Sequence, residues 1–340
     1  MAKQRMRKAT LQDVLVYLDE PQLVTLKSLK QKVVALAVDA EGMENAYFAT
    51  TVTPKDWDRY LRGAVDLRYL FEYAKGRRPY IFDWVSGSEH IYLDPFTDEV
   101  PEDFLPAPRF FSRDHTEPDG VSESSLSEQS FGIDGEWELR DFSKFYSQYE
   151  DVYSLNWAVS VFDDQSTPAP RRRQIVDSFV KHPWRGGFSY VHFYEQLSNL
   201  QQAADRISVD RIQYNSPGVV VINGDEGVLH DANLAISRFE ENFDEIKNSY
   251  AELHKYLSEA KLLKAEIPHY ENKGAVADYI AGRTANLASL LGLTTLSTIR
   301  SLCGKNELLT AKVVLSYHRR VKNAFFFFAE GRITLDEDFS

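Results

Sequence analysis

The chain has 340 residues, of which 43% are hydrophobic and 13% aromatic, and this composition is typical of a folded protein with a substantial core. Its 51 acidic residues outnumber the 39 lysines and arginines, so the formal net charge of −12 excludes a surface that is basic overall and grips nucleic acid everywhere. The single cysteine, Cys303, excludes an intramolecular disulfide and is typical of a reducing compartment. The longest apolar run, residues 324–329, is far shorter than the roughly 20 residues that a membrane span needs. We therefore expect a cytoplasmic protein.

Short β-rich stretches separated by turn residues predict an antiparallel sheet in the first hundred residues. They lie at residues 14–18, 23–26, 33–38 and 46–52, and two more follow at 80–85 and 90–93. Between the fourth and the fifth stretch, Thr53 and Pro54 are typical of a helix start, and apolar residues at three-and-four spacing continue the helix to Gly76. These elements predict a small α+β domain over residues 9–107.

Composition changes after this domain. Residues 108–130 are rich in Pro, Ser and acidic side chains, which predicts an acidic linker or a long loop. Residues 131–340 then predict a mixed region, with a hairpin at 206–222 followed by helices over 225–330. The expected fold class is α+β, with a small N-terminal domain of antiparallel sheet plus helix and a mainly helical C-terminal region.

The clearest periodicity lies at residues 229–260, where apolar side chains alternate spacings of three and four and predict a long coiled-coil-like helix. Such a seam needs a facing helix, from a second copy of the chain or from the same chain. Few complementary charges flank the seam, and Pro268 lets the chain turn back, so we favour an antiparallel partner within the chain, at residues 275–293 or 306–328. The candidate interface residues on the seam are Phe239, Phe243, Ile246, Tyr250 and Leu253.

Four consecutive phenylalanines, Phe325, Phe326, Phe327 and Phe328, form a second candidate interface. Successive side chains point in different directions on a helix or a strand. Some of these rings must therefore face another part of the fold, or a partner.

Catalytic motifs are absent from the sequence. It contains no glycine-rich phosphate loop, dinucleotide fingerprint, His-Glu-x-x-His or nucleophile elbow. Its eight histidines have no repeated ligand spacing, so we expect no metal and no cofactor. Cys303 is more typical of a small residue at a helix end than of a nucleophile. These features favour a non-enzymatic protein and leave open an active site assembled from scattered residues.

The most specific local pattern is a candidate ligand-binding segment formed by His182, Trp184, Arg185, Gly186, Gly187 and Ser189. The paired glycines let the backbone approach a ligand, and Arg185 places a cation beside the first amides of the next helix, which suits a phosphate or carboxylate. The alternative is a tight turn with Trp184 anchored in the core. A basic run, Arg171, Arg172 and Arg173, is a candidate contact for a nucleic-acid backbone, with a solvated helix face as the alternative.

Four short motifs resemble a family of uncharacterised bacterial proteins. They are YLDEPQLV at residues 17–24, VDLR at 65–68, PWRGGFS at 183–189 and YNSPG at 214–218. The resemblance implies a bacterial, intracellular setting and supplies no functional residues. Families of this kind often lie in defence-associated gene clusters, which is an association and not a property of these residues.

Two hypotheses follow. The first is a non-enzymatic binding or regulatory protein that acts through contacts with another protein or a second copy of itself, in the setting of a defence-associated complex. The second is a sensor or enzyme for a small phosphorylated or carboxylated ligand bound near Arg185–Ser189.

Overall fold

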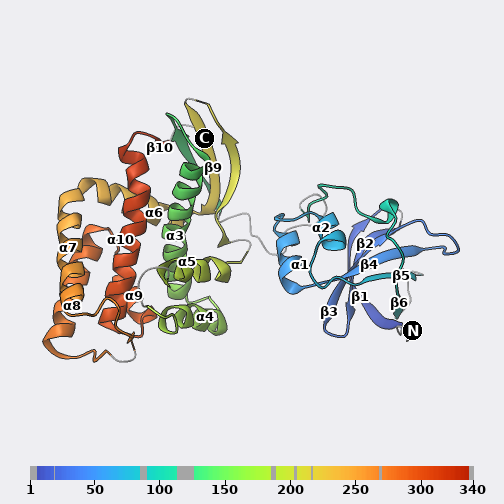
Figure 1. Ribbon diagram of the computed structural model, residues 1–340, viewed down its shortest axis with the longest axis horizontal. Helices are drawn as coiled ribbons and strands as arrows, with labels where there is room; N and C mark the ends of the chain where they lie inside the picture. The colour runs from blue at the N-terminus through green and yellow to red at the C-terminus, as the bar shows by residue number, and fades with distance from the viewer. Residues whose placement is uncertain are drawn as a thin grey trace. The chain divides into compact units, whose positions relative to one another are not determined.

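The chain forms two compact units, Met1–Val121 and Ser122–Ser340. Figure 1 shows a β-barrel in the first unit, and helices with a small sheet in the second. The computed structural model describes residues 6–18, 20–84, 90–112, 126–184, 189–202, 205–215, 217–267 and 270–336. Most of the predicted linker, residues 113–125, lies outside this range, and its last residues, 126–130, belong to a strand.

The N-terminal unit is a closed antiparallel barrel in which six strands follow one another in chain order. The strands are β1 (Arg7–Tyr17), β2 (Pro21–Ser28), β3 (Gln31–Ala37), β4 (Ala46–Val52), β5 (Pro79–Asp83) and β6 (Ile91–Pro95). The strands overlap the predicted stretches, and the predicted antiparallel sheet is found in the form of a closed barrel. β1 also pairs with β6, with Arg7 opposite Leu93, and this pairing closes the barrel. The β1–β6 pairing joins residues far apart in the chain, so no local sequence pattern predicts it.

Strand β4 is buried on both faces, which explains its apolar run. Tyr47 points into the barrel and stacks on Phe82, with ring centroids 5.4 Å apart. Its neighbour Phe48 points to the outer face and contacts Phe71 at 5.9 Å. Side chains alternate across a strand, so β4 contributes to two separate cores.

Helices cover the outer face of β4. They are α1 (Pro54–Leu61) and α2 (Leu67–Glu72), and a 3-10 turn, η1 (Glu102–Phe104), follows β6. Thr53 caps α1, because its Oγ1 accepts a hydrogen bond from the Asp56 amide at 3.1 Å. The single helix predicted as far as Gly76 is instead two. Gly63 takes a positive φ of 67° between them, and the Asp66 side chain caps the second.

The sheet of the C-terminal unit has the strand order β10, β7, β9, β8. Its strands are β7 (Leu126–Ile133), β8 (Ser208–Gln213), β9 (Gly218–Asp225) and β10 (Ile333–Asp336). The predicted hairpin is present as β8 and β9. The other two strands were not expected, because β7 begins in the polar segment and β10 lies near the far end of the chain, with Ile333 opposite Ile133.

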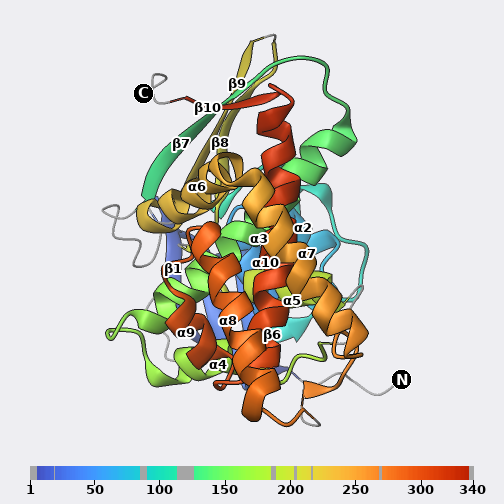
Figure 2. The same ribbon diagram turned by 90° about the vertical axis from the view of Figure 1, so that its left-hand side faces the viewer.

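Eight helices pack in this unit within the described residues. They are α3 (Leu139–Asp163), α4 (Ala169–Val180), α5 (Ser189–Leu200), α6 (Glu226–Glu241), α7 (Phe243–Glu259), α8 (Gly274–Leu290), α9 (Leu296–Leu302) and α10 (Glu307–Ala329). Every residue from Leu308 to His318 is buried, so α10 is the central helix, with α3, α6 and α8 packed around it (Figures 1 and 2). None of the described helices combines the length and the apolar run that a bilayer crossing requires.

The prediction of one long coiled-coil-like helix is wrong. The chain forms two helices that meet at Asn242, whose backbone φ of −118° leaves the helical range. Both the backbone amide and the Nδ2 group of Asn242 donate hydrogen bonds to the carbonyl oxygen of Arg238, each at 3.0 Å. The backbone bond is the last helical bond of α6, and the side-chain bond to the same oxygen stabilises the helix end there.

Candidate functional site

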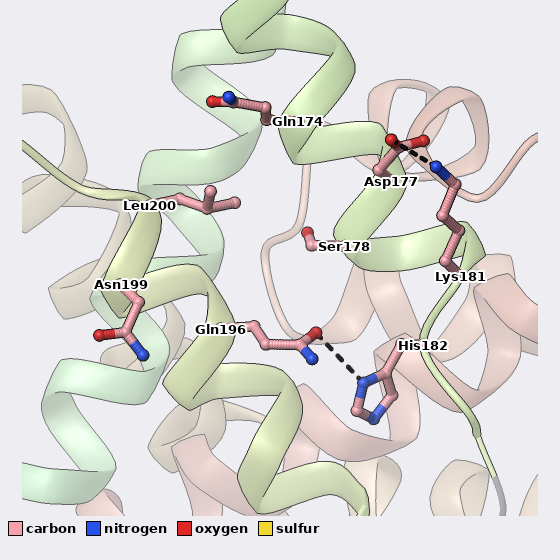
Figure 3. Close-up of a pocket in the computed structure, with 8 residues that line it drawn as sticks. All are labelled: Gln174, Asp177, Ser178, Lys181, His182, Gln196, Asn199 and Leu200. Carbon is pink, nitrogen blue, oxygen red and sulfur yellow. Dashed lines mark hydrogen bonds and ion pairs between the residues drawn. The ribbon is translucent and has the colours of Figure 1, made fainter. Parts of the chain in front are cut away.

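A hollow of about 480 Å³ lies between α4 and α5, beside the segment predicted to bind a ligand (Figure 3). The Nζ of Lys181 donates to Asp177 Oδ2 at 2.7 Å, and His182 Nδ1 lies 3.3 Å from Gln196 Oε1. The other lining residues are Gln174, Ser178, Asn199 and Leu200. Since the Lys181 charge is already paired with a carboxylate, the further polar groups of the lining are mainly amides and a hydroxyl, beside a larger apolar surface.

Trp184 lies in the core and is only 2% exposed. Its Nε1 donates to the carbonyl oxygen of Phe179 at 2.8 Å, and its ring lies 4.6 Å from that of Phe193. His182 is also buried and contacts the Trp184 ring edge-on at 5.1 Å. Both side chains therefore help to hold α4 against α5.

The rest of the predicted ligand segment is not described. Arg185, Gly186 and Gly187 lie outside the described residues, and α5 begins at Ser189, whose side chain is also outside them. Ligand binding by this segment therefore stays a prediction.

A buried lysine, which the sequence pattern did not single out, donates hydrogen bonds to the backbone next to the predicted ligand segment. Lys312 is fully buried on α10, and its Nζ donates to the carbonyl oxygens of Trp184 and Ala265, each at 2.8 Å. Burial lowers the pKa of Lys312 to about 8. The apolar residues on both sides of it, Ala311 and residues 313–315, are the signal that could have identified it.

The candidate interface on the seam packs within the chain. Phe239 contacts Phe325 at 5.1 Å, and further along α7 the ring of Tyr250 lies 4.0 Å from that of His318. Residue numbers that increase along α6 and α7 therefore lie opposite residue numbers that decrease along α10. The helices run antiparallel, which confirms the expected partner in the same chain. The remaining seam residues are Phe243, which contacts Phe325 at 5.9 Å, and the buried Ile246 and Leu253.

Helix α8 is a second antiparallel neighbour of α7. Tyr256 contacts Tyr279 at 4.4 Å, and Asn286 Nδ2 donates to Ser249 Oγ at 3.0 Å. Both segments proposed as partners for the seam therefore pack against it.

The four phenylalanines spread around α10. Phe325 is buried against α6 and α7, whereas Phe327 packs on Trp137 at 5.5 Å and Phe328 contacts Phe131 at 6.4 Å. Phe326 is 39% exposed. A rotation of about 100° per helical residue accounts for this spread, and three of the rings stabilise the fold.

Of the basic run, Arg171 makes an ion pair with Asp205, and its guanidinium lies 5.6 Å above the Trp157 ring. Arg173 is exposed. Contact of this run with nucleic acid stays a prediction.

Cys303 is buried at the end of α9, and burial raises the pKa of its thiol well above the usual range. A thiol that stays protonated is a poor nucleophile. Among the described residues, no three His, Cys, Asp or Glu side chains form a cluster that suits a metal ion.

Strand β8 was expected from the sequence as part of a hairpin, but its position at the exposed edge of the sheet was not. It lies at the end of the strand order, next to β9. All of its residues are exposed. Two of them are apolar, Val209 at 53% and Ile212 at 55% exposure. An edge strand with exposed apolar side chains is a template for pairing with another chain.

No protein-family model, no curated protein and no solved structure matches this chain. Its function is therefore inferred from its own residues.

Proposed function

We propose that this protein is a non-enzymatic binding or regulatory protein that acts through protein–protein contacts, and that β8 forms a contact with a second copy of the chain. The observation that carries this proposal is the edge position of β8. In the described part of the chain it has a strand neighbour, β9, on one side only, which leaves the backbone amides and carbonyls of its other side without a strand partner there. The seam and three of the four phenylalanines contribute less to such a contact, because they pack inside the chain.

The sequence of β8 is self-complementary in the antiparallel direction. It is Ser-Val-Asp-Arg-Ile-Gln over Ser208–Gln213, and a two-fold axis at its centre places Asp210 opposite Arg211 of the second copy. The same axis places Val209 opposite Ile212. Opposite charges and apolar side chains that face each other across strands each contribute about 0.2–1 kcal/mol. Because of the symmetry, each pair occurs twice.

A bulge at Asp210 interrupts the pairing of β8 with β9, where Val209 lies opposite Ile222 and Arg211 opposite Val221. A bulge increases the local twist, and in some sheets it protects an edge from pairing. Charge swaps at Asp210 and Arg211 therefore test whether this edge pairs with a second copy or is protected by the bulge.

The test compares four chains by native mass spectrometry and by size exclusion over a range of concentrations. The wild type is expected to be a dimer. Arg211→Asp places aspartates opposite each other twice and is expected to give a monomer. The double swap Asp210→Arg with Arg211→Asp restores both ion pairs and is expected to restore the dimer. Lys247→Asp, an exposed change on α7, is the control and is expected to leave the dimer intact.

Two results would contradict the proposal. A wild type that is monomeric at every concentration excludes the second copy as the partner. An Arg211→Asp chain that dimerises as strongly as the wild type places the interface elsewhere.

The defence-associated setting that the resemblance implies stays a prediction. The alternative function, a sensor or enzyme for a small phosphorylated or carboxylated ligand near Arg185–Ser189, is supported by the hollow that His182 lines. A ligand-induced rise in melting temperature that Arg185→Glu abolishes would favour that alternative.

A further inference from the structure

A second hollow lies at one end of the N-terminal barrel. β1 and β5 start there and β6 ends there, with Arg7 opposite Leu93 and Tyr80 opposite Pro95. The hollow has a volume of about 690 Å³. This is within the range of about 300–1,000 Å³ that is common for small-molecule sites.

Three arginines line this hollow: Arg7, Arg77 and Arg78. Arg7 Nη1 donates to the side-chain oxygen of Gln31 at 3.1 Å, and Arg77 Nη1 donates to the carbonyl oxygen of Phe71 at 3.0 Å. Both acceptors are neutral. In the described part of the chain no carboxylate makes an ion pair with any of the three guanidinium groups.

Several other arginines of this acidic protein are paired with carboxylates. In the same unit, Arg68 makes ion pairs with both Glu72 and Glu102. In the other unit, Arg320 Nε lies 2.6 Å from Asp151 Oδ2. With 51 acidic residues in the chain, three cations that share a hollow without a carboxylate are an unusual arrangement. Their mutual repulsion is relieved when an anion binds between them.

The backbone that carries two of these arginines is held in place. The Arg78 amide donates to Thr51 Oγ1 at 3.0 Å, and the Thr51 amide donates to the Arg78 carbonyl oxygen at 3.2 Å. Thr51 Oγ1 also donates to the Gly76 carbonyl oxygen at 3.3 Å. These bonds fix the turn before β5 to the end of β4, so the arginine backbone is already ordered before a ligand arrives.

We propose that this hollow binds the phosphate groups of a phosphorylated small molecule. The planar guanidinium donates two parallel hydrogen bonds to a phosphate, and three such groups suit a diphosphate or triphosphate better than a single carboxylate. Pro79, Pro95 and Phe96 form an apolar wall of the same hollow. That wall suits a flat apolar group, so the ligand class is a nucleoside polyphosphate. The site belongs to the N-terminal unit and does not depend on pairing through β8.

The test measures binding of three probes to the full chain by isothermal titration calorimetry at low salt. The probes are inorganic pyrophosphate, adenosine triphosphate and adenosine. The triphosphate is expected to bind most tightly, pyrophosphate more weakly, and adenosine without measurable affinity. Arg78→Glu and Arg77→Glu are each expected to weaken triphosphate binding by at least tenfold. Lys75→Glu removes an exposed cation from the same turn outside the hollow and is expected to keep the affinity within about twofold.

Thermal melting without ligand checks that the exposed substitutions leave the fold intact. Failure of the wild type to bind either phosphorylated probe would overturn the proposal, as would equal binding by the wild type and Arg78→Glu. Single-stranded DNA is an additional arm. Retention of DNA by the wild type, with loss in Arg78→Glu and no binding of the small probes, would replace the small molecule by a nucleic-acid backbone.

Discussion

The imidazole of His318 on α10 lies face to face with the phenol ring of Tyr250 on α7, with centroids 4.0 Å apart and planes 17° apart. Phe239 contacts the same imidazole at 5.4 Å. Burial, together with the nearby charges of Lys322 and Arg319, lowers the pKa of His318 to about 3. This contact therefore joins the central helix to the seam through a ring that stays neutral at physiological pH.

His318 makes stability depend on pH. In the unfolded chain His318 binds a proton near the ordinary histidine pKa of about 6.5, whereas in the folded chain it does so only near pH 3. The unfolded state therefore holds more protons between these two values, and the free energy of unfolding falls as the pH decreases from 6.5 to 3. The slope from this group is at most about 1.4 kcal/mol per pH unit. His318→Phe keeps an aromatic ring and is expected to remove that slope. Urea unfolding at pH 7, 5.5 and 4 measures it.

His192→Phe is the control, since His192 is an exposed residue on α5, where it faces Glu195. This variant is expected to keep the acid sensitivity of the wild type. Equal pH profiles for the wild type and His318→Phe would show that the acid sensitivity arises elsewhere.

Lys312→Met is expected to lower the free energy of unfolding by about 1–3 kcal/mol at pH 7, because the buried carbonyl oxygens of Trp184 and Ala265 lose their donor. Chemical unfolding measures the loss. Lys255→Met, on the exposed surface of α7, is the matched control and should change stability by no more than about 0.5 kcal/mol. A Lys312→Met chain as stable as the wild type would mean that these two bonds contribute little.

The same lysine predicts behaviour in base. The folded chain releases the Lys312 proton near pH 8, and the unfolded chain releases it near 10.5. Because the unfolded state holds more protons between these values, the wild type gains stability relative to Lys312→Met as the pH rises from 8 to 10. Melting temperatures of both chains across this range measure the difference. A constant difference would contradict the lowered pKa.

Substitutions at Phe325 and Phe326 distinguish two roles of the phenylalanine cluster, packing in the core and contact at the surface. Phe325→Ala leaves a cavity between α10 and α6 and is expected to cost about 3–5 kcal/mol. Phe326→Ala is expected to cost about 1 kcal/mol or less, because that ring is partly exposed. Chemical unfolding compares the two. Similar losses in the free energy of unfolding would show that the Phe326 ring is buried in solution, for example against a second copy of the chain.

Thr53 tests the helix start that the sequence pattern identified. Thr53→Ala removes the acceptor for the Asp56 amide at the first turn of α1, and the expected cost is about 1 kcal/mol. Lys55→Ala, an exposed change in the same turn, is the control and should be nearly neutral. Thermal unfolding of the full chain gives both values. A neutral Thr53→Ala would mean that Pro54 alone defines this helix start.

The sequence by itself determined the features that depend on neighbouring residues. The strands of the barrel, the cap at Thr53, and the hairpin at β8 and β9 all follow from residue spacing and turn chemistry. Each is a local signal, because propensity and periodicity act over a few residues. The break at Asn242 escaped detection because the apolar spacing continues through it, whereas the backbone angle of this one residue leaves the helical range.

Only the tertiary structure decided the rest. Closure of the barrel by β1 and β6, the pairing of β10 with β7, and the double contact of Lys312 join residues far apart in the chain, and no local pattern encodes such pairings. The two candidate surfaces arise in the same way. Pairing of distant strands brings Arg7 to Arg77 and Arg78 at one end of the barrel, and the strand order of the second sheet leaves β8 with a free edge.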